Sequence, residues 1–160
     1  IAGRADIIAQ LKSHPLMRAL RIDKLSLAAL EATLLLYRAP HDPLSEVPVL
    51  AMLSEPVADV ENRANVLASQ LVQIGIEGVQ VQHSKAFVGG GSLPQQDLAS
   101  FAVSIRLPDL SAKDLAFALR SSATPVIGRI EKDHVLLDMR TVRGDDLHLI
   151  ANTMAQITNR

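Results

Sequence analysis

The order of periodic segments after residue 56 constrains the fold of this chain more than any other feature of its sequence. Apolar residues recur every three or four positions where a helix buries one face, and they alternate with polar residues where a strand is half buried. The segments are, in order, a helix at 57–74, strands at 77–84 and 101–107, a helix at 111–122, a hairpin of strands at 126–131 and 134–140, and a helix capped by Asp145. Gly75 is expected to end the first helix in a left-handed conformation, and Lys132-Asp133 to form the turn of the hairpin. This order predicts an α+β fold, with an antiparallel sheet covered by helices on one face.

The first 50 residues have a different character. A helical pattern begins close to the start of the chain and is interrupted at His14-Pro15, because the residue before a proline resists helical geometry. A second helix is predicted from Lys24 to Arg38, and its leucines leave so little polar face that we expect it to be buried on most sides. Residues 39–56 carry four of the eight prolines, which indicates a connector between two domains, 1–50 and 51–160.

Composition excludes several classes of function. With no cysteine, the chain has neither a disulfide scaffold nor a thiolate metal site, and this fits a reducing cytoplasm. The five histidines are scattered, so no metal site is expected. Only 2% of the residues are aromatic and the formal net charge is -1, which argues against a base-stacking or strongly basic surface for nucleic acid. No apolar run is long enough for a transmembrane helix.

Two arginines, Arg18 and Arg21, lie three residues apart between short apolar anchors in the segment His14–Lys24. Residues with this spacing share one side of a helical turn, so two guanidinium groups could converge on one small anion. A guanidinium presents its donors in a fixed plane that suits phosphate-like oxyanions better than an ammonium does. The alternative is that both side chains are simply solvated at a surface turn.

Three blocks of sequence follow one another in a recognisable order. They are His14–Lys24 with Leu27–Leu34, then Val88–Pro94, then Pro125–Glu131 running on to Leu137–Val142. The blocks resemble the bacterial selenocysteine synthase family, the L-seryl-tRNA(Sec) selenium transferases, which belong to the fold-type-I class of pyridoxal phosphate (PLP) enzymes. The resemblance spans nearly the whole chain, although the stretch from Ala39 to Gln82 is not distinctive.

The resemblance implies that this chain is the C-terminal part of such a transferase. Residues 1–50 would be the end of the large PLP domain with a connecting helix and linker, and 51–160 the small α+β domain. The enzyme would convert seryl-tRNA(Sec) to selenocysteinyl-tRNA(Sec) with selenophosphate, in the cytoplasm, as a decameric homo-oligomer built as a ring of dimers. The Schiff-base lysine and the N-terminal domain that binds most of the tRNA would precede Ile1, so the chain alone is expected to be inactive and to hold no catalytic residue.

The resemblance also implies roles for individual residues. Arg18 and Arg21 match the family's positions for binding selenophosphate. Arg129 is expected to meet the ester carbonyl or the terminal phosphate of the tRNA, unless it is only paired with Glu131 or Asp138 across the hairpin. Further contacts with the substrate or the tRNA end are expected from Gly90, Gly91 and Ser92, although a glycine run can also be a plain turn.

Other interpretations stay open on the sequence. The chain could belong to another fold-type-I PLP lyase or transferase, or it could be a free-standing ferredoxin-like module that binds a small ligand, with residues 1–50 as a helical arm. Lys24 is the nearest lysine to the arginine motif, but it lies beside Asp23 at a helix start, where an ordinary paired or solvated ammonium is expected and a Schiff-base lysine is not.

Overall fold

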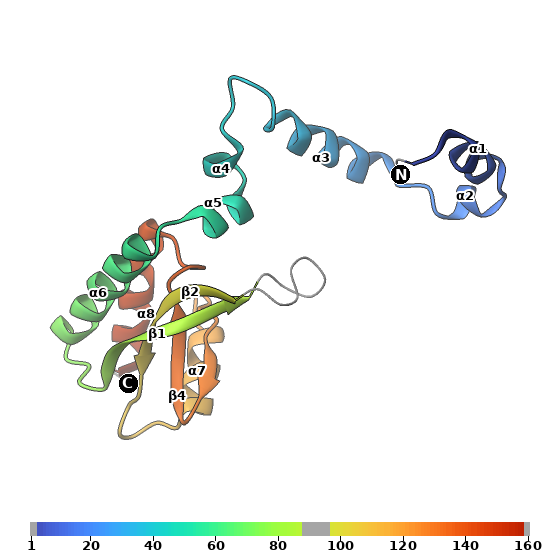
Figure 1. Ribbon diagram of the computed structural model, residues 1–160. Helices are drawn as coiled ribbons and strands as arrows, with labels where there is room; N and C mark the ends of the chain where they lie inside the picture. Colours follow the sequence, from blue (N-terminus) through green and yellow to red (C-terminus); the bar gives the residue numbers. More distant parts are fainter. Residues whose placement is uncertain (1–2, 88–96, 159–160) are drawn as a thin grey trace. The chain divides into compact units, whose positions relative to one another are not determined.

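The computed structural model describes residues 3–87 and 97–158 of the chain (Figure 1). The chain divides into two compact units, Ile1–Ala51 and Met52–Arg160. No helix among the described residues is long and apolar enough to cross a membrane. The two units differ in how they are built, and we describe each separately.

The first unit is made of short helices. They are α1 (Ala5–Ser13), α2 (Leu16–Ala19), α3 (Lys24–Leu35) and α4 (Pro43–Glu46), with α5 (Pro48–Ser54) running across the boundary into the second unit. Asp23 caps α3, because its carboxylate accepts hydrogen bonds from the amides of Leu25, at 2.9 Å, and Ser26, at 3.0 Å. The predicted interruption at His14-Pro15 is confirmed, since α1 ends at Ser13.

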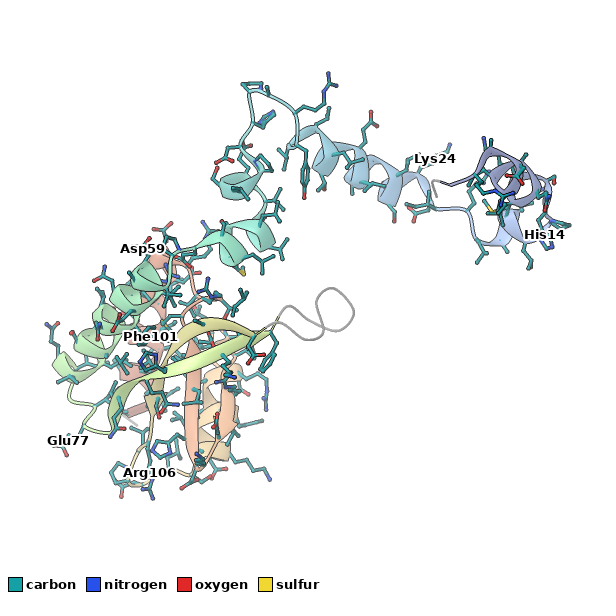
Figure 2. All side chains as sticks on the ribbon, in the orientation of Figure 1. His14, Lys24, Asp59, Glu77, Phe101 and Arg106 are labelled. Carbon is teal, nitrogen blue, oxygen red and sulfur yellow. The ribbon has the colours of Figure 1, made fainter. Side chains whose placement is uncertain are left out.

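Helix α3 is the main departure from prediction in this unit. All of its residues from Lys24 to Leu35 are exposed, so the expectation that the helix would be buried on most sides is wrong for this chain. The helix begins at Lys24, marked in Figure 2, and ends three residues before Arg38. The leucine-rich composition of α3 favours burial. Among residues 3–51, however, only Val47 is buried, so the first unit has no core against which α3 could pack.

The second unit confirms the α+β prediction. Its elements are α6 (Val57–Gln73), β1 (Val79–Phe87), β2 (Asp97–Ile105), α7 (Ala112–Arg120), β3 (Arg129–Glu131), β4 (His134–Asp138), a 3-10 turn (Gly144–Asp146) and α8 (Leu147–Thr158). The four strands form one sheet in the order β1-β2-β4-β3, and every neighbouring pair is antiparallel. The predicted elements are all present, with changed ends.

The turns explain the sheet's connections. Lys132 and Asp133 have φ values of 48° and 62°, the left-handed pair required by a two-residue hairpin turn, so the predicted hairpin is confirmed. Gly75, which follows the C-cap residue of α6, has a φ of 89°, as expected for a helix stop. Asp145 lies inside the 3-10 turn that precedes α8, so the prediction that it caps the last helix is wrong.

Alternation along β2 separates the two faces of the sheet. Phe101, Val103 and Ile105 point into a core that α6, α7 and α8 complete, together with Val135 and Leu137 of β4. The intervening residues Ser100, Ala102 and Ser104 point to the opposite face. The helices α6, α7 and α8 therefore cover one face of the sheet, as predicted, and none of these three packs on the face that carries the small residues (Figure 1).

Two arginines fix the beginning of the second unit to its sheet. Arg140 is 5% exposed and donates hydrogen bonds to the carbonyl oxygens of Met52 (2.9 Å), Glu55 (3.0 Å) and Ala99 (2.5 Å). Arg63 of α6 binds the Glu55 carboxylate with two bonds of 2.6 Å and donates to the Met139 carbonyl at 2.8 Å. The segment before α6 is thus bound to the end of β4 and to β2.

Replacing Arg140 by alanine should destabilise the second unit. The change leaves three partly buried carbonyl groups without donors, which we expect to lower the free energy of unfolding by about 2 kcal/mol. Urea unfolding followed by circular dichroism measures this change. Arg106→Ala is the matched control, because the side chain of Arg106 is exposed and its ion pair with Asp133 spans 3.7 Å; it should shift stability by no more than about 0.5 kcal/mol. Equal effects of the two substitutions would contradict the role given to Arg140.

The exposed apolar surface of α3 should make the chain self-associate. Contiguous exposed leucines favour association because burying them removes apolar surface from water. Light scattering should give a mass above that of one chain, and the double substitution Leu30→Glu with Leu34→Glu should return the chain to a monomer. Val66→Glu with Val72→Glu, on exposed positions of α6, is the control and should leave association unchanged. A monodisperse monomer of the unsubstituted chain would oppose this interpretation.

Candidate functional site

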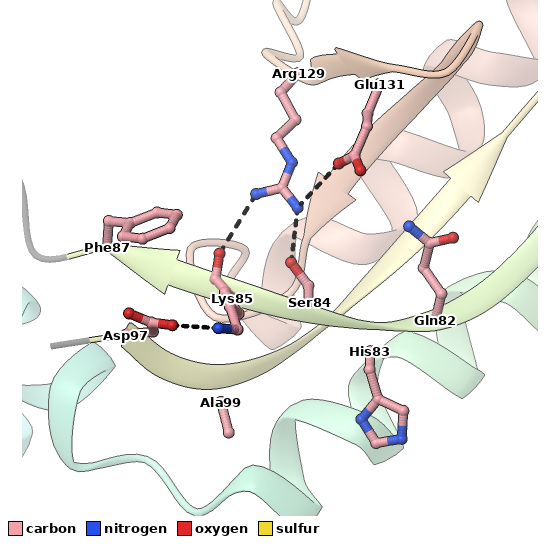
Figure 3. Close-up of a pocket in the computed structure, with 9 residues that line it drawn as sticks. All are labelled: Gln82, His83, Ser84, Lys85, Phe87, Asp97, Ala99, Arg129 and Glu131. Atoms are coloured by element: carbon pink, nitrogen blue, oxygen red, sulfur yellow. Dashed lines mark hydrogen bonds and ion pairs between the residues drawn. The ribbon is translucent and has the colours of Figure 1, made fainter.

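An open cavity is lined by residues from both faces of the sheet, at the paired ends of β1 and β2, together with two residues of β3. Its volume is about 820 Å³, and it is lined by residues of β1, β2 and β3 (Figure 3). The lining residues are Gln82, His83, Ser84, Lys85, Phe87, Asp97, Ala99, Arg129 and Glu131. This cavity contains Arg129, one of the residues predicted to contact substrate.

Arg129 lies over β1 although it belongs to the opposite edge strand, β3. The register pairs it with Leu136, which places both on the face away from the helices. Its Nη2 donates to Ser84 Oγ at 2.8 Å, and its Nη1 to the Lys85 carbonyl at 3.5 Å. Small side chains at the centre of this face leave room for the guanidinium to reach across.

The predicted alternative, pairing of Arg129 with acidic residues of the hairpin, is present only in a loose form. Its closest approaches are 3.9 Å to a Glu131 oxygen and 3.8 Å to an Asp138 oxygen. The short hydrogen bond goes to a neutral hydroxyl, and 43% of the arginine side chain is exposed. The exposed pair with Glu131 is screened by solvent and contributes little, whereas the Asp138 side chain is only 14% exposed. The guanidinium still has an exposed surface on which a ligand could bind.

Asp138 positions the serine that holds Arg129. Its carboxylate accepts hydrogen bonds from Ser84 Oγ (2.9 Å), Ser100 Oγ (2.6 Å) and the Arg140 amide (3.1 Å). Because the Ser84 hydroxyl donates its hydrogen bond to Asp138, its oxygen lone pairs can accept a hydrogen bond from Arg129. Asp138 therefore orients the Ser84 hydroxyl towards Arg129. Through its bond to the Arg140 amide, Asp138 also links the cavity to the buried Arg140.

Lys85 and Asp97, which also line the cavity, form an ion pair across β1 and β2. Phe87, the last residue of β1, lines the same cavity with 73% of its surface exposed. Sequence reasoning missed these residues and Ser84. The alternation that predicted β1 could have placed Ser84 on a face, but nothing in the sequence indicated which residues of the other strands would oppose it.

The structure gives Arg18 and Arg21 different settings. Arg18 lies in α2, which ends at Ala19, so the expectation that both arginines share one helical turn is wrong. Both side chains are exposed, and neither makes a hydrogen bond or ion pair with any residue in 3–87 or 97–158. Their assignment to an anion stays a prediction. Gly90, Gly91 and Ser92 lie outside the described residues.

The lysines of this chain do not fit the attachment of PLP. All five lysines are exposed, and Lys24 is simply the first residue of α3. Lys85 lines the cavity but is paired with Asp97. A Schiff-base lysine is usually desolvated or placed beside another cation, whereas these lysines are exposed. Within the described part of the chain, no three His, Asp or Glu residues are grouped as metal ligands.

Comparison with known proteins gives one consistent result. A family model described as L-seryl-tRNA selenium transferase matches residues 1–143. The L-seryl-tRNA(Sec) selenium transferase of Hyphomonas neptunium is 56% identical over 160 residues, which is 100% of this chain and 35% of that protein. The proteins of the same name from Geotalea uraniireducens and Carboxydothermus hydrogenoformans are 43% and 40% identical, each over 92% of this chain and 32% of their own length. The chain spans about a third of the length of these relatives.

Proposed function

Because the chain belongs to the L-seryl-tRNA selenium transferase family, we propose that it is the C-terminal third of an enzyme that converts seryl-tRNA(Sec) to selenocysteinyl-tRNA(Sec) with selenophosphate. The observation that carries this proposal is the 56% identity to a protein of that name over all 160 residues. The first and second units would be the end of a fold-type-I large domain and the small domain, in a cytoplasmic enzyme.

The cofactor of this proposal is PLP, held by a lysine that precedes this chain. PLP supplies the electron sink for chemistry at the α-carbon of the seryl group, and the protein supplies placement and charge. The absence of a suitable lysine among the five present agrees with this division of roles. The catalytic group is therefore not assigned to any residue of this chain.

Arg18 and Arg21 are proposed to bind selenophosphate. Their guanidinium groups are exposed and uncommitted within the described residues, so no existing ion pair has to be broken for them to bind an anion. Two exposed cations near each other in sequence repel one another slightly in the absence of an anion, and a multiply charged oxyanion removes that repulsion. Arg129 and its cavity are proposed to contact the acceptor end of the tRNA.

Helix α3 is proposed to be buried in the complete homo-oligomer. The helix has apolar residues on all sides and no core in its own unit to cover them. Burying a leucine side chain contributes roughly 1.5–3 kcal/mol, so its surface is large enough to contribute strongly to assembly.

The proposed function is tested with a chimera in which this chain replaces the matching third of the Hyphomonas neptunium enzyme. The chimera should form selenocysteinyl-tRNA(Sec) from seryl-tRNA(Sec) and selenophosphate, whereas the 160-residue chain alone should not. Treatment with PLP and borohydride should label a lysine of the Hyphomonas portion, as found by peptide mass mapping. A stoichiometric adduct on Lys24 would refute the assignment of the cofactor lysine to the preceding segment.

Single substitutions in the chimera test the arginine pair. Charge-assisted hydrogen bonds contribute roughly 1.5–3 kcal/mol, so Arg18→Ala or Arg21→Ala should weaken the use of selenophosphate by about 10- to 100-fold. Lysine at either position should restore only part of it, because a point charge lacks the planar geometry. Arg38→Ala, at an exposed arginine outside the motif, is the control. Normal dependence on selenophosphate with reduced tRNA affinity would assign the pair to the nucleic acid.

A further inference from the structure

We propose that the cavity beside Phe87 and Arg129 binds a nucleobase, and that its occupant is the 3′ end of an RNA. The second part rests on the proposed function, because transfer RNAs end in the sequence CCA and the relatives are named for a tRNA substrate. The inference changes the role of Arg129, from contacting a phosphate or ester to contacting the face or edge of a base.

Phe87 provides the stacking surface. Phe87 is the last residue of β1, and 73% of its surface is exposed although the neighbouring strand β2 packs against the core. It lines a cavity that also contains polar groups. Of the two other phenylalanines, Phe101 is buried in the core, and Phe117 is exposed on α7, away from this cavity. An exposed aromatic ring in a polar cavity is the arrangement that single-stranded nucleic acids use for base stacking.

Arg129 provides a second planar group in the lining of the same cavity. Figure 3 shows its guanidinium and the Phe87 ring among the residues that line the cavity. The bond to Ser84, itself fixed by Asp138, orients the guanidinium. A guanidinium plane stacks on bases as an aromatic ring does, and its edge donates hydrogen bonds to base acceptors.

The charge balance of the cavity favours a base over a phosphate. Its lining has two cations, Lys85 and Arg129, and two anions, Asp97 and Glu131, so no positive charge is left over. Lys85 is already paired with Asp97, and Glu131 lies 3.9 Å from Arg129. A phosphate would be repelled by both carboxylates. The exocyclic amine of a cytosine or adenine, in contrast, can donate to Glu131 or to the Gln82 amide oxygen.

The binding test uses the 160-residue chain with the trinucleotide CpCpA, followed by NMR of the phenylalanine rings. The Phe87 resonances should shift on titration while those of Phe117 stay in place. Phe87→Ala should weaken binding by at least about fivefold, Phe87→Tyr should keep it, and Phe117→Ala, at a ring that is 61% exposed, should have no effect. Loss of binding in Phe117→Ala, or unchanged binding in Phe87→Ala, would overturn the assignment.

Three further arms separate a base from other occupants. Affinity for CpCpA should change by less than about threefold between about 50 and 200 mM salt, the change expected for a single phosphate contact. Inorganic phosphate should not compete, and adenosine 5′-monophosphate should bind more weakly than CpCpA. Competition by phosphate would show an anion site, and tighter binding of the mononucleotide would show a free-nucleotide site; either result would overturn the proposal.

The chimera connects this inference to the reaction. Phe87→Ala should raise KM for seryl-tRNA by at least about fivefold and leave kcat and the KM for selenophosphate nearly unchanged, because stacking on a remote base contributes to binding of substrate and transition state alike. If the chimera is active and Phe87→Ala leaves its KM for seryl-tRNA unchanged, this inference is wrong and the proposed function still holds. An inactive but folded chimera would overturn the proposed function, and the CpCpA titration would still decide the base site.

Discussion

The alternation of side chains along β2 determines how the second unit is organised. Of the two strands that have a neighbour on each side, β2 is the longer and the more buried. Because successive side chains point to opposite faces, β2 can give large apolar residues to three helices and small residues to the other face. The large residues build the core, which stabilises the unit. The small ones, Ser100, Ala102 and Ser104, leave the opposite face low enough for an arginine from the far edge strand to lie across it. The core and the path of Arg129 across the sheet are thus two results of one alternating strand.

The part of the fold that local physics determines could be predicted from the sequence. The helix at 57–74, its glycine stop and the hairpin turn at Lys132-Asp133 depend on residues close together in the chain, and all three are present. The ends of strands depend on pairing partners, which the sequence does not reveal. The strand predicted to begin at Phe101 therefore begins at Asp97, since it pairs with a β1 that extends to Phe87.

The candidate site could be predicted only one residue at a time. The sequence indicates Arg129 and its possible partners Glu131 and Asp138, but Ser84 and Phe87 join it only through the register of the strands. Arg18 and Arg21 show the opposite limit, because their spacing was read as a helical turn and the helix ends between them, at Ala19. The long helix α3 was predicted to be buried because its composition requires a partner, and that partner does not lie in its own unit.

The bonds of Arg140 have a consequence for how this sequence can vary. The side chain is held by three carbonyl oxygens of the main chain, at Met52, Glu55 and Ala99. Every residue type carries such a carbonyl, so positions 52 and 99 can drift through many side chains without losing the contact. Arg140 has no such freedom, since no other side chain presents several donors in one plane. Keeping these three hydrogen bonds therefore requires an arginine at position 140, whereas the side chains at the positions it contacts can change.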